Sequence, residues 1–90
     1  MATKQATRRL EFPKRPAIQD GELARRRIWR SRCGVWAVVH SVSKFGLPDT
    51  WNILRQAAAW EHWTGWKIVA RRRARKAAFD AAQRLAREAG

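Results

Sequence analysis

The feature that most constrains this chain is the distribution of charge along the sequence. Residues 1–32 contain ten basic and three acidic residues, a net charge of +7, and residues 67–90 contain eight basic and two acidic residues, a net charge of +6. Residues 33–66 contain two of each and carry no net charge, yet they hold five of the six tryptophans. This pattern predicts a core built from the middle of the chain, with cationic surfaces contributed by both ends.

The length of 90 residues is enough for one domain with a modest core. Tryptophan enlarges that core, because each buried aromatic side chain removes about 150–250 Å² from water. Pro13 and Pro16 break any helix near the start of the chain, and the apolar residues around them have no clear period. We therefore expect residues 1–19 to form a basic N-terminal arm and residues 20–90 to form a single small domain.

Local sequence patterns favour an α+β fold. Asp20 is placed to cap a short helix over residues 22–32. Alternating apolar and β-branched residues predict three strands, over residues 35–43, 50–55 and 66–71. A stripe of alanines predicts a C-terminal helix over residues 74–89. The expected fold is a small antiparallel sheet of about three strands with the C-terminal helix packed on it, plus a short N-terminal helix.

An all-α fold resembling a helix-turn-helix is the alternative. Asp49 could cap a helix that runs through Trp63, with Gly46 in the turn before it. The positions six and nine residues after that glycine should then be apolar, but they are Asn52 and Arg55. We therefore prefer the α+β interpretation.

A run of basic residues stands at the start of the predicted C-terminal helix. Cations are unfavourable there, because a helix N-terminus already carries roughly half a positive charge. A bound phosphate would relieve this conflict, since free backbone N–H groups and cations would both face it. The alternative is a solvated charged surface. The predicted phosphate-binding residues of this run are Arg71, Arg72, Arg73, Arg75 and Lys76.

The same run, read as Arg71-Arg72-Arg73-Ala74-Arg75-Lys76-Ala77-Ala78, resembles the Lys-Lys-x-Ala-Lys-x-x-Ala segment of double-stranded-RNA-binding domains. The turn at Gly46-Leu47-Pro48, followed by Trp51, is similar to the first hairpin of that family. The resemblance covers the C-terminal half of the chain. It implies a β-β-β-α architecture in which the cations that open the last helix contact phosphates across a groove.

Two further groups of residues are candidates for a nucleic-acid surface. Basic residues gather in the predicted N-terminal helix, where the alternative is a solubilising surface; they include Arg25, Arg26, Arg27 and Arg30. Tryptophans at 60, 63 and 66 cannot all point inward from one strand, because alternate side chains face opposite sides. We expect Trp63 or Trp60 at the surface, where it could stack on bases, although such residues also build cores.

These observations predict a small nucleic-acid-binding protein that contacts the phosphate backbone with low sequence specificity, and they do not separate DNA from RNA. The alternative function is that of a phage- or plasmid-encoded inhibitor or adaptor that docks on a protein partner with an acidic or nucleic-acid-binding surface. Catalysis is not expected, and neither is a cofactor, because His40, His62 and Cys33 have neither catalytic partners nor the spacing of metal ligands. No membrane segment is found, and we expect a cytoplasmic protein.

Overall fold

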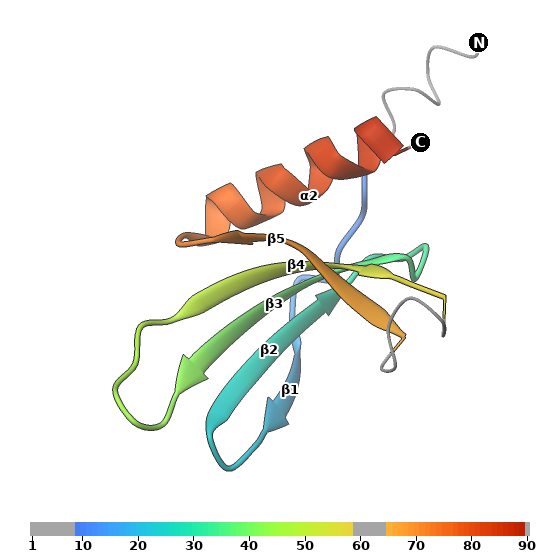
Figure 1. The fold of residues 1–90 in the computed structure, drawn as a ribbon. Coiled ribbons are helices and arrows are strands. Elements are labelled where there is room, and N and C mark those ends of the chain that lie inside the picture. Colours follow the sequence, from blue (N-terminus) through green and yellow to red (C-terminus); the bar gives the residue numbers. More distant parts are fainter. Residues whose placement is uncertain (1–8, 59–64, 90) are drawn as a thin grey trace, which may run out of the picture.

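The computed structural model describes residues 9–58 and 65–89 of the chain. Five strands precede one helix: β1 (Ala17–Asp20), β2 (Ala24–Arg30), β3 (Trp36–Ser43), β4 (Thr50–Gln56), β5 (Trp66–Arg72) and α2 (Arg75–Ala89). Every pair of neighbouring strands is antiparallel, and the order in the sheet is the order in the sequence. Figure 1 shows the resulting meander, with α2 on one face of the sheet.

The predicted fold class is wrong in its first element and in the number of strands. Residues 24–30 form β2 instead of a helix, and β1 precedes them, so the sheet has five strands. The all-α alternative is also wrong, because residues 50–56 form β4. A helix would have turned both Leu23 and Trp29 inward, whereas the sheet buries Trp29 and leaves Leu23 at the surface. Pairing with β3 along the whole of β2 overrides the local helix signals.

The strands predicted over 35–43, 50–55 and 66–71 and the C-terminal helix are found, each within one residue of its expected ends. β1 crosses the predicted boundary between arm and domain at residue 19. Two residues of the predicted arm, Leu10 and Phe12, pack against the core. The side-chain amide of Gln83 on α2 bonds both the N–H and the carbonyl of Leu10, at 2.8 and 2.9 Å.

The core lies between the sheet and α2. Trp29 and Trp51 stack with their ring centroids 5.7 Å apart, and Phe79 of α2 meets Trp29 edge-on at 5.5 Å. Small side chains on the inner side of α2 allow this close approach; they are Ala78, Ala81 and Ala82, all buried. Val38 and Ile53 are fully buried beneath the helix, at 0% exposure.

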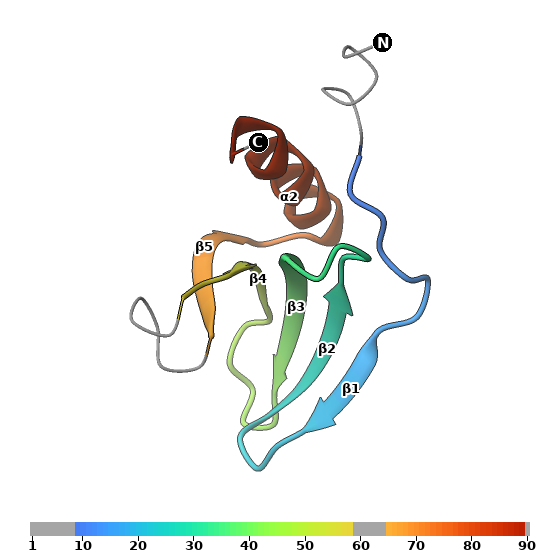
Figure 2. The same cartoon turned by 90° about the vertical axis from the view of Figure 1, so that its right-hand side faces the viewer.

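One face of the sheet is covered and the other is open. α2 packs on β3, β4 and β5, and we call that side the covered face. Figures 1 and 2 show no element of the described chain over the opposite side, which we call the open face. A register shift in the β4–β5 pair, between Ile53 and Leu54, adds one residue to β5. Through this bulge Val69 and Ala70 both pack on the core, and the residues around them keep alternating between the two faces.

Candidate nucleic-acid interface

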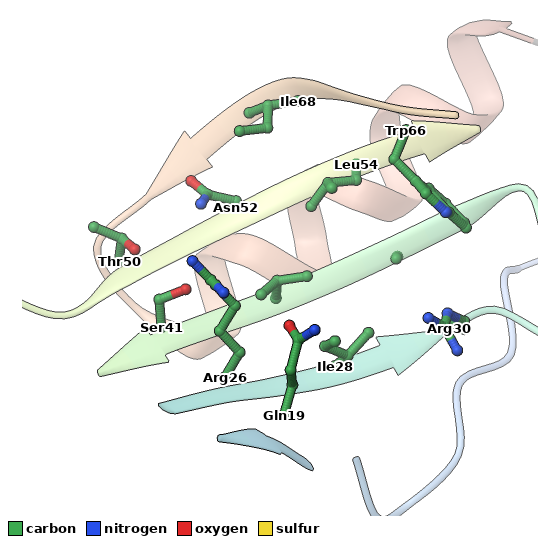
Figure 3. Close-up of a pocket in the computed structure, with 12 residues that line it drawn as sticks. Gln19, Arg26, Ile28, Arg30, Ser41, Thr50, Asn52, Leu54, Trp66 and Ile68 are labelled. Carbon is green, nitrogen blue, oxygen red and sulfur yellow. The ribbon is translucent and has the colours of Figure 1, made fainter. Parts of the chain in front are cut away.

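The open face is hollowed into a groove of about 630 Å³. Figure 3 shows its side chains rising from the five strands. Directly opposed residues of antiparallel strands share a face, so the strand register decides which residues meet here. The groove is lined by Gln19, Arg26, Ile28, Arg30, Ala37, Val39, Ser41, Thr50, Asn52, Leu54, Trp66 and Ile68.

Cross-strand pairing arranges these residues in three rows. The polar row is Gln19, Arg26, Ser41 and Thr50. The middle row is Ile28, Val39, Asn52 and Arg71. The apolar row is Arg30, Ala37, Leu54 and Ile68. The open face therefore changes from hydrogen-bonding to hydrophobic along the direction of the strands, with an arginine in every row.

The floor of the groove is buried although no described element lies over it. Ala37 and Val39 are only 3% and 9% exposed. Longer side chains on the neighbouring strands oppose them, Ile28 of β2 beside Val39 and Leu54 of β4 beside Ala37, and these longer side chains stand partly in solvent. The groove thus combines an apolar floor with accessible sides, which suits a ligand that has flat apolar parts.

The charge on this face is not neutralised within the described chain. Five of the six described acidic residues have a cationic or histidine partner: Glu11 with Arg32, Asp20 with Lys44, Asp49 with His40, Asp80 with Lys76, and Glu88 with Arg84. The Lys44 ammonium lowers the pKa of Asp20, and that of Lys76 lowers the pKa of Asp80, chiefly through hydrogen bonds. No described acidic group pairs with the exposed side chains of Arg26, Arg30 and Arg71 on this face, or with that of Arg73, which follows the end of β5.

Strand alternation divides the cationic cluster that the sequence placed in one helix. Arg26 and Arg30 lie on the open face and line the groove. Arg25 and Arg27 pair with Val42 and His40, which puts them on the covered side of the sheet. The predicted cluster is therefore two groups of arginines on opposite faces.

The run from Arg71 to Lys76 is divided too. Arg71 and Arg72 belong to β5 and not to the helix. Together with Arg73, they line a second pocket of about 670 Å³ beside the start of β4. Arg75 and Lys76 do open α2, and both have partners within the protein. The Arg75 guanidinium lies 5.4 Å from the ring centroid of Trp29, and Lys76 binds Asp80 at 2.8 Å.

The uncharged half of the open face was not predicted from the sequence. Gln19, Ser41, Thr50 and Asn52 were not singled out, although the alternation in residues 35–43 already divided that strand into two sides. The missing information was which strands are neighbours and in what register. Trp63 and Trp60, expected at the surface, lie outside the described residues, while Trp66 lines the groove.

No protein-family model matches the chain, and neither a curated protein nor a solved structure matches it. The resemblance to double-stranded-RNA-binding domains therefore stays a prediction. No helix in the described part of the chain is long and apolar enough to cross a membrane. Residues 9–58 and 65–89 contain no group of three or more histidine, cysteine, aspartate or glutamate residues arranged to hold a metal ion.

Proposed function

We propose that this protein binds nucleic acid, with the open face and its arginines as the contact surface. The observation that carries this proposal is the set of exposed arginines on that face that have no acidic partner among the described residues, in a protein that pairs most of its described acids elsewhere. Arginine forks bind phosphate oxygens through two parallel hydrogen bonds. A surface of this kind attracts polyanions, and phosphate contacts of this kind dominate the affinity for nucleic acid.

The spacing of the arginines supports a backbone contact on each side of the groove. Arg26 and Arg30 stand on β2, and Arg71 stands on β5, with β3 and β4 between them. Three strand spacings of about 4.8 Å separate β2 from β5 by roughly 14 Å. Phosphates at either rim would leave the bases over the floor of the groove.

The start of α2 contributes less to the proposed surface than the sequence predicted. Arg75 lies over Trp29 and also 5.8 Å from the ring centroid of Phe79, and Lys76 forms an i, i+4 ion pair with Asp80. These contacts offset the conflict between the cations and the helix dipole without any ligand. The proposed phosphate contacts are accordingly those of the open-face arginines of β2 and of Arg71 to Arg73. The expected compartment of the protein is still the cytoplasm.

The proposal is tested with a double variant on the groove and a matched double variant on the helix. Arg26→Gln with Arg30→Gln removes two charges from the open face, and Arg84→Gln with Arg87→Gln removes two from exposed positions on α2. Binding to labelled single-stranded and duplex oligonucleotides is measured from about 50 mM to about 200 mM salt. We expect the groove variant to reduce the slope of log affinity against log salt by about 0.7–0.9 for each phosphate that is no longer neutralised, and the helix variant to change it little. Equal reductions in the two variants would mean that net charge, and not the open face, drives binding.

A second function is favoured by the end of the sheet at which the hairpins turn. Leu23, Phe45 and Leu47 are 71%, 71% and 69% exposed there. The two turns lie side by side, since the N–H of Lys44 donates to the carbonyl of Leu23 at 3.0 Å. An exposed apolar patch such as the one these three side chains form suits a protein-binding adaptor. The phage or plasmid origin of such an adaptor is still a prediction. If the salt series detects no affinity for any nucleic acid, the adaptor function is the better one.

A further inference from the structure

The open face differs from a surface that contacts only phosphates, because two of its three rows carry uncharged side chains able to contact bases. We propose that its ligand is single-stranded nucleic acid, with the apolar row against base faces and the polar row against base edges. This inference rests on the proposed function, since it names the form of nucleic acid that the same groove binds. It also departs from the low specificity expected from the sequence.

The apolar row is suited to the flat faces of bases. Leu54 and Ile68 stand side by side on β4 and β5, and Trp66 lines the same end of the groove (Figure 3). In a duplex the base faces are covered by the stack, so a protein can reach them only in a single strand or an unpaired region. Stacking of bases on aromatic side chains, which Trp66 offers in this groove, is tolerant of sequence and adds strongly to affinity.

The polar row is suited to base edges because its hydrogen-bonding groups are unused within the described chain. No described residue forms a hydrogen bond with the side chains of Gln19, Ser41 or Thr50. In the adjoining middle row, the side-chain oxygen of Asn52 is buried and has no hydrogen-bond partner. Buried polar atoms normally have one. A donor on a base would satisfy that oxygen.

The spacing of the rows also favours unstacked bases. Successive residues on one face of a strand lie about 6.6–6.8 Å apart. That is about twice the 3.4 Å rise of each nucleotide within a duplex strand. A nucleic-acid strand that follows the protein strands must therefore separate its bases to place one on each row. Arg26 and Arg30 would then stand along one rim of the groove, and Arg71 would stand at the opposite rim.

The first test compares forms of nucleic acid with the intact protein. Labelled dA, dC and dT homopolymers of about twelve nucleotides, their RNA counterparts and a duplex of the same length are titrated at one low salt concentration. We expect the preferred single strand to bind roughly tenfold more tightly than the duplex, with a range of about threefold or more among the bases. A duplex that binds as tightly as the single strands would overturn this inference while leaving the proposed function intact. Absence of binding to every probe would contradict the proposed function itself.

The second test separates the two rows by substitution. Leu54→Ala with Ile68→Ala should weaken every single strand by about tenfold and leave the preference among bases unchanged. Thr50→Val in the polar row with Asn52→Leu in the adjoining middle row should have the opposite effect, because the ratio of affinities among the bases should fall toward one while the salt slope stays unchanged. Far-UV circular dichroism and the urea midpoint establish that both variants are folded. A base preference that survives these two substitutions would refute the proposed contact between the polar side chains and base edges.

The same variants test the competing occupant of the groove, a second copy of this chain. Sedimentation equilibrium gives the oligomeric state of the parent protein and of the Leu54→Ala, Ile68→Ala variant. We expect the same state for both. A parent dimer that this variant dissociates, with no single-strand affinity in the parent, would assign the apolar row to self-association.

Discussion

The two faces of the sheet are built from the same strands, but one is buried beneath α2 and the other is open to solvent. On the covered face, aromatic and aliphatic side chains are sealed beneath α2, and Trp51 stacks on both Trp29 and His40. On the open face, residues of similar type remain half-exposed around a groove. β4 shows this contrast in two consecutive residues, because Ile53 is fully buried and Leu54 is only partly so. Alternation thus lets one strand contribute to stability and to the proposed binding surface independently.

The arginines show the same contrast with a single residue type. Arg75 on the covered side lies over Trp29 and Phe79, so its charge has a partner within the protein. Arg26 and Arg30 on the open side are exposed and have no acidic partner among the described residues. A chain with 20 basic residues gives no hint of this difference in its composition. The partners of each arginine, and not their number, identify the surface that is available to a ligand.

The largest effect that separates the two faces is expected at adjacent positions of β4. Ile53→Ala should lower the free energy of unfolding by about 2–5 kcal/mol, since it leaves a cavity in the core beneath α2. Leu54→Ala should lower it by roughly 1 kcal/mol or less, because that side chain is already partly in solvent. Urea denaturation of the two variants measures both values. Equal decreases would mean that the open face is as much a part of the core as the covered face.

A smaller effect of the same kind is expected on α2. Ala82→Leu should destabilise the protein by about 1–3 kcal/mol, because Ala82 is fully buried against the sheet and a larger side chain would push the helix away. Ala77→Leu is the matched control, since Ala77 is exposed on the same helix and should tolerate the change. Thermal unfolding of the two variants provides the comparison. A tolerated leucine at position 82 would show that the helix is not held closely on the sheet.

The elements with strong local periodicity were predictable from the sequence, and the N-terminal hairpin was not. The alternation in residues 35–43 predicts a strand, the alanine stripe of the C-terminal segment predicts a helix, and the structure contains both. Residues 22–32 carry an apparent cap at Asp20 and no clear strand period, because arginines occupy both faces of β2. Their strand state comes from pairing with β3. Local propensity does not predict this pairing, because the pairing depends on residues outside the segment itself.

The candidate site was predictable only in its charge. Clustered cations identified Arg26, Arg30 and Arg71 in the sequence, but Arg26 and Arg30 were expected in a helix and Arg71 in the basic run that opens the C-terminal helix. The uncharged residues of the groove, such as Ser41 and Asn52, carry no signal of their own, since each is an ordinary strand residue until the register places it beside the others. The hollow in which they gather depends on five strands at once.

The smallest effect concerns two serines that have opposite roles in the fold. Ser31 is buried, and its Oγ accepts a hydrogen bond from the N–H of Trp36 at 3.1 Å. Ser41 lies on the open face and forms no hydrogen bond with the described residues through its side chain. Ser31→Ala should therefore cost about 1 kcal/mol by leaving the Trp36 N–H unpaired, whereas Ser41→Ala should leave the free energy of unfolding unchanged.

The same pair of variants has a chemical readout at Cys33, the one cysteine of the chain. Because Ser31 Oγ accepts from Trp36, its hydroxyl hydrogen is free to donate to Cys33 Sγ, which lies 3.2 Å away. That hydrogen bond stabilises the thiolate and, ahead of the nearby backbone N–H groups, lowers the pKa of Cys33. Ser31→Ala should raise this pKa, so alkylation by iodoacetamide should slow at any pH below it and converge with the parent rate at higher pH. Ser41→Ala should leave the whole pH profile of alkylation in place. A profile that Ser31→Ala also leaves in place would show that the backbone groups alone set the acidity of the thiol.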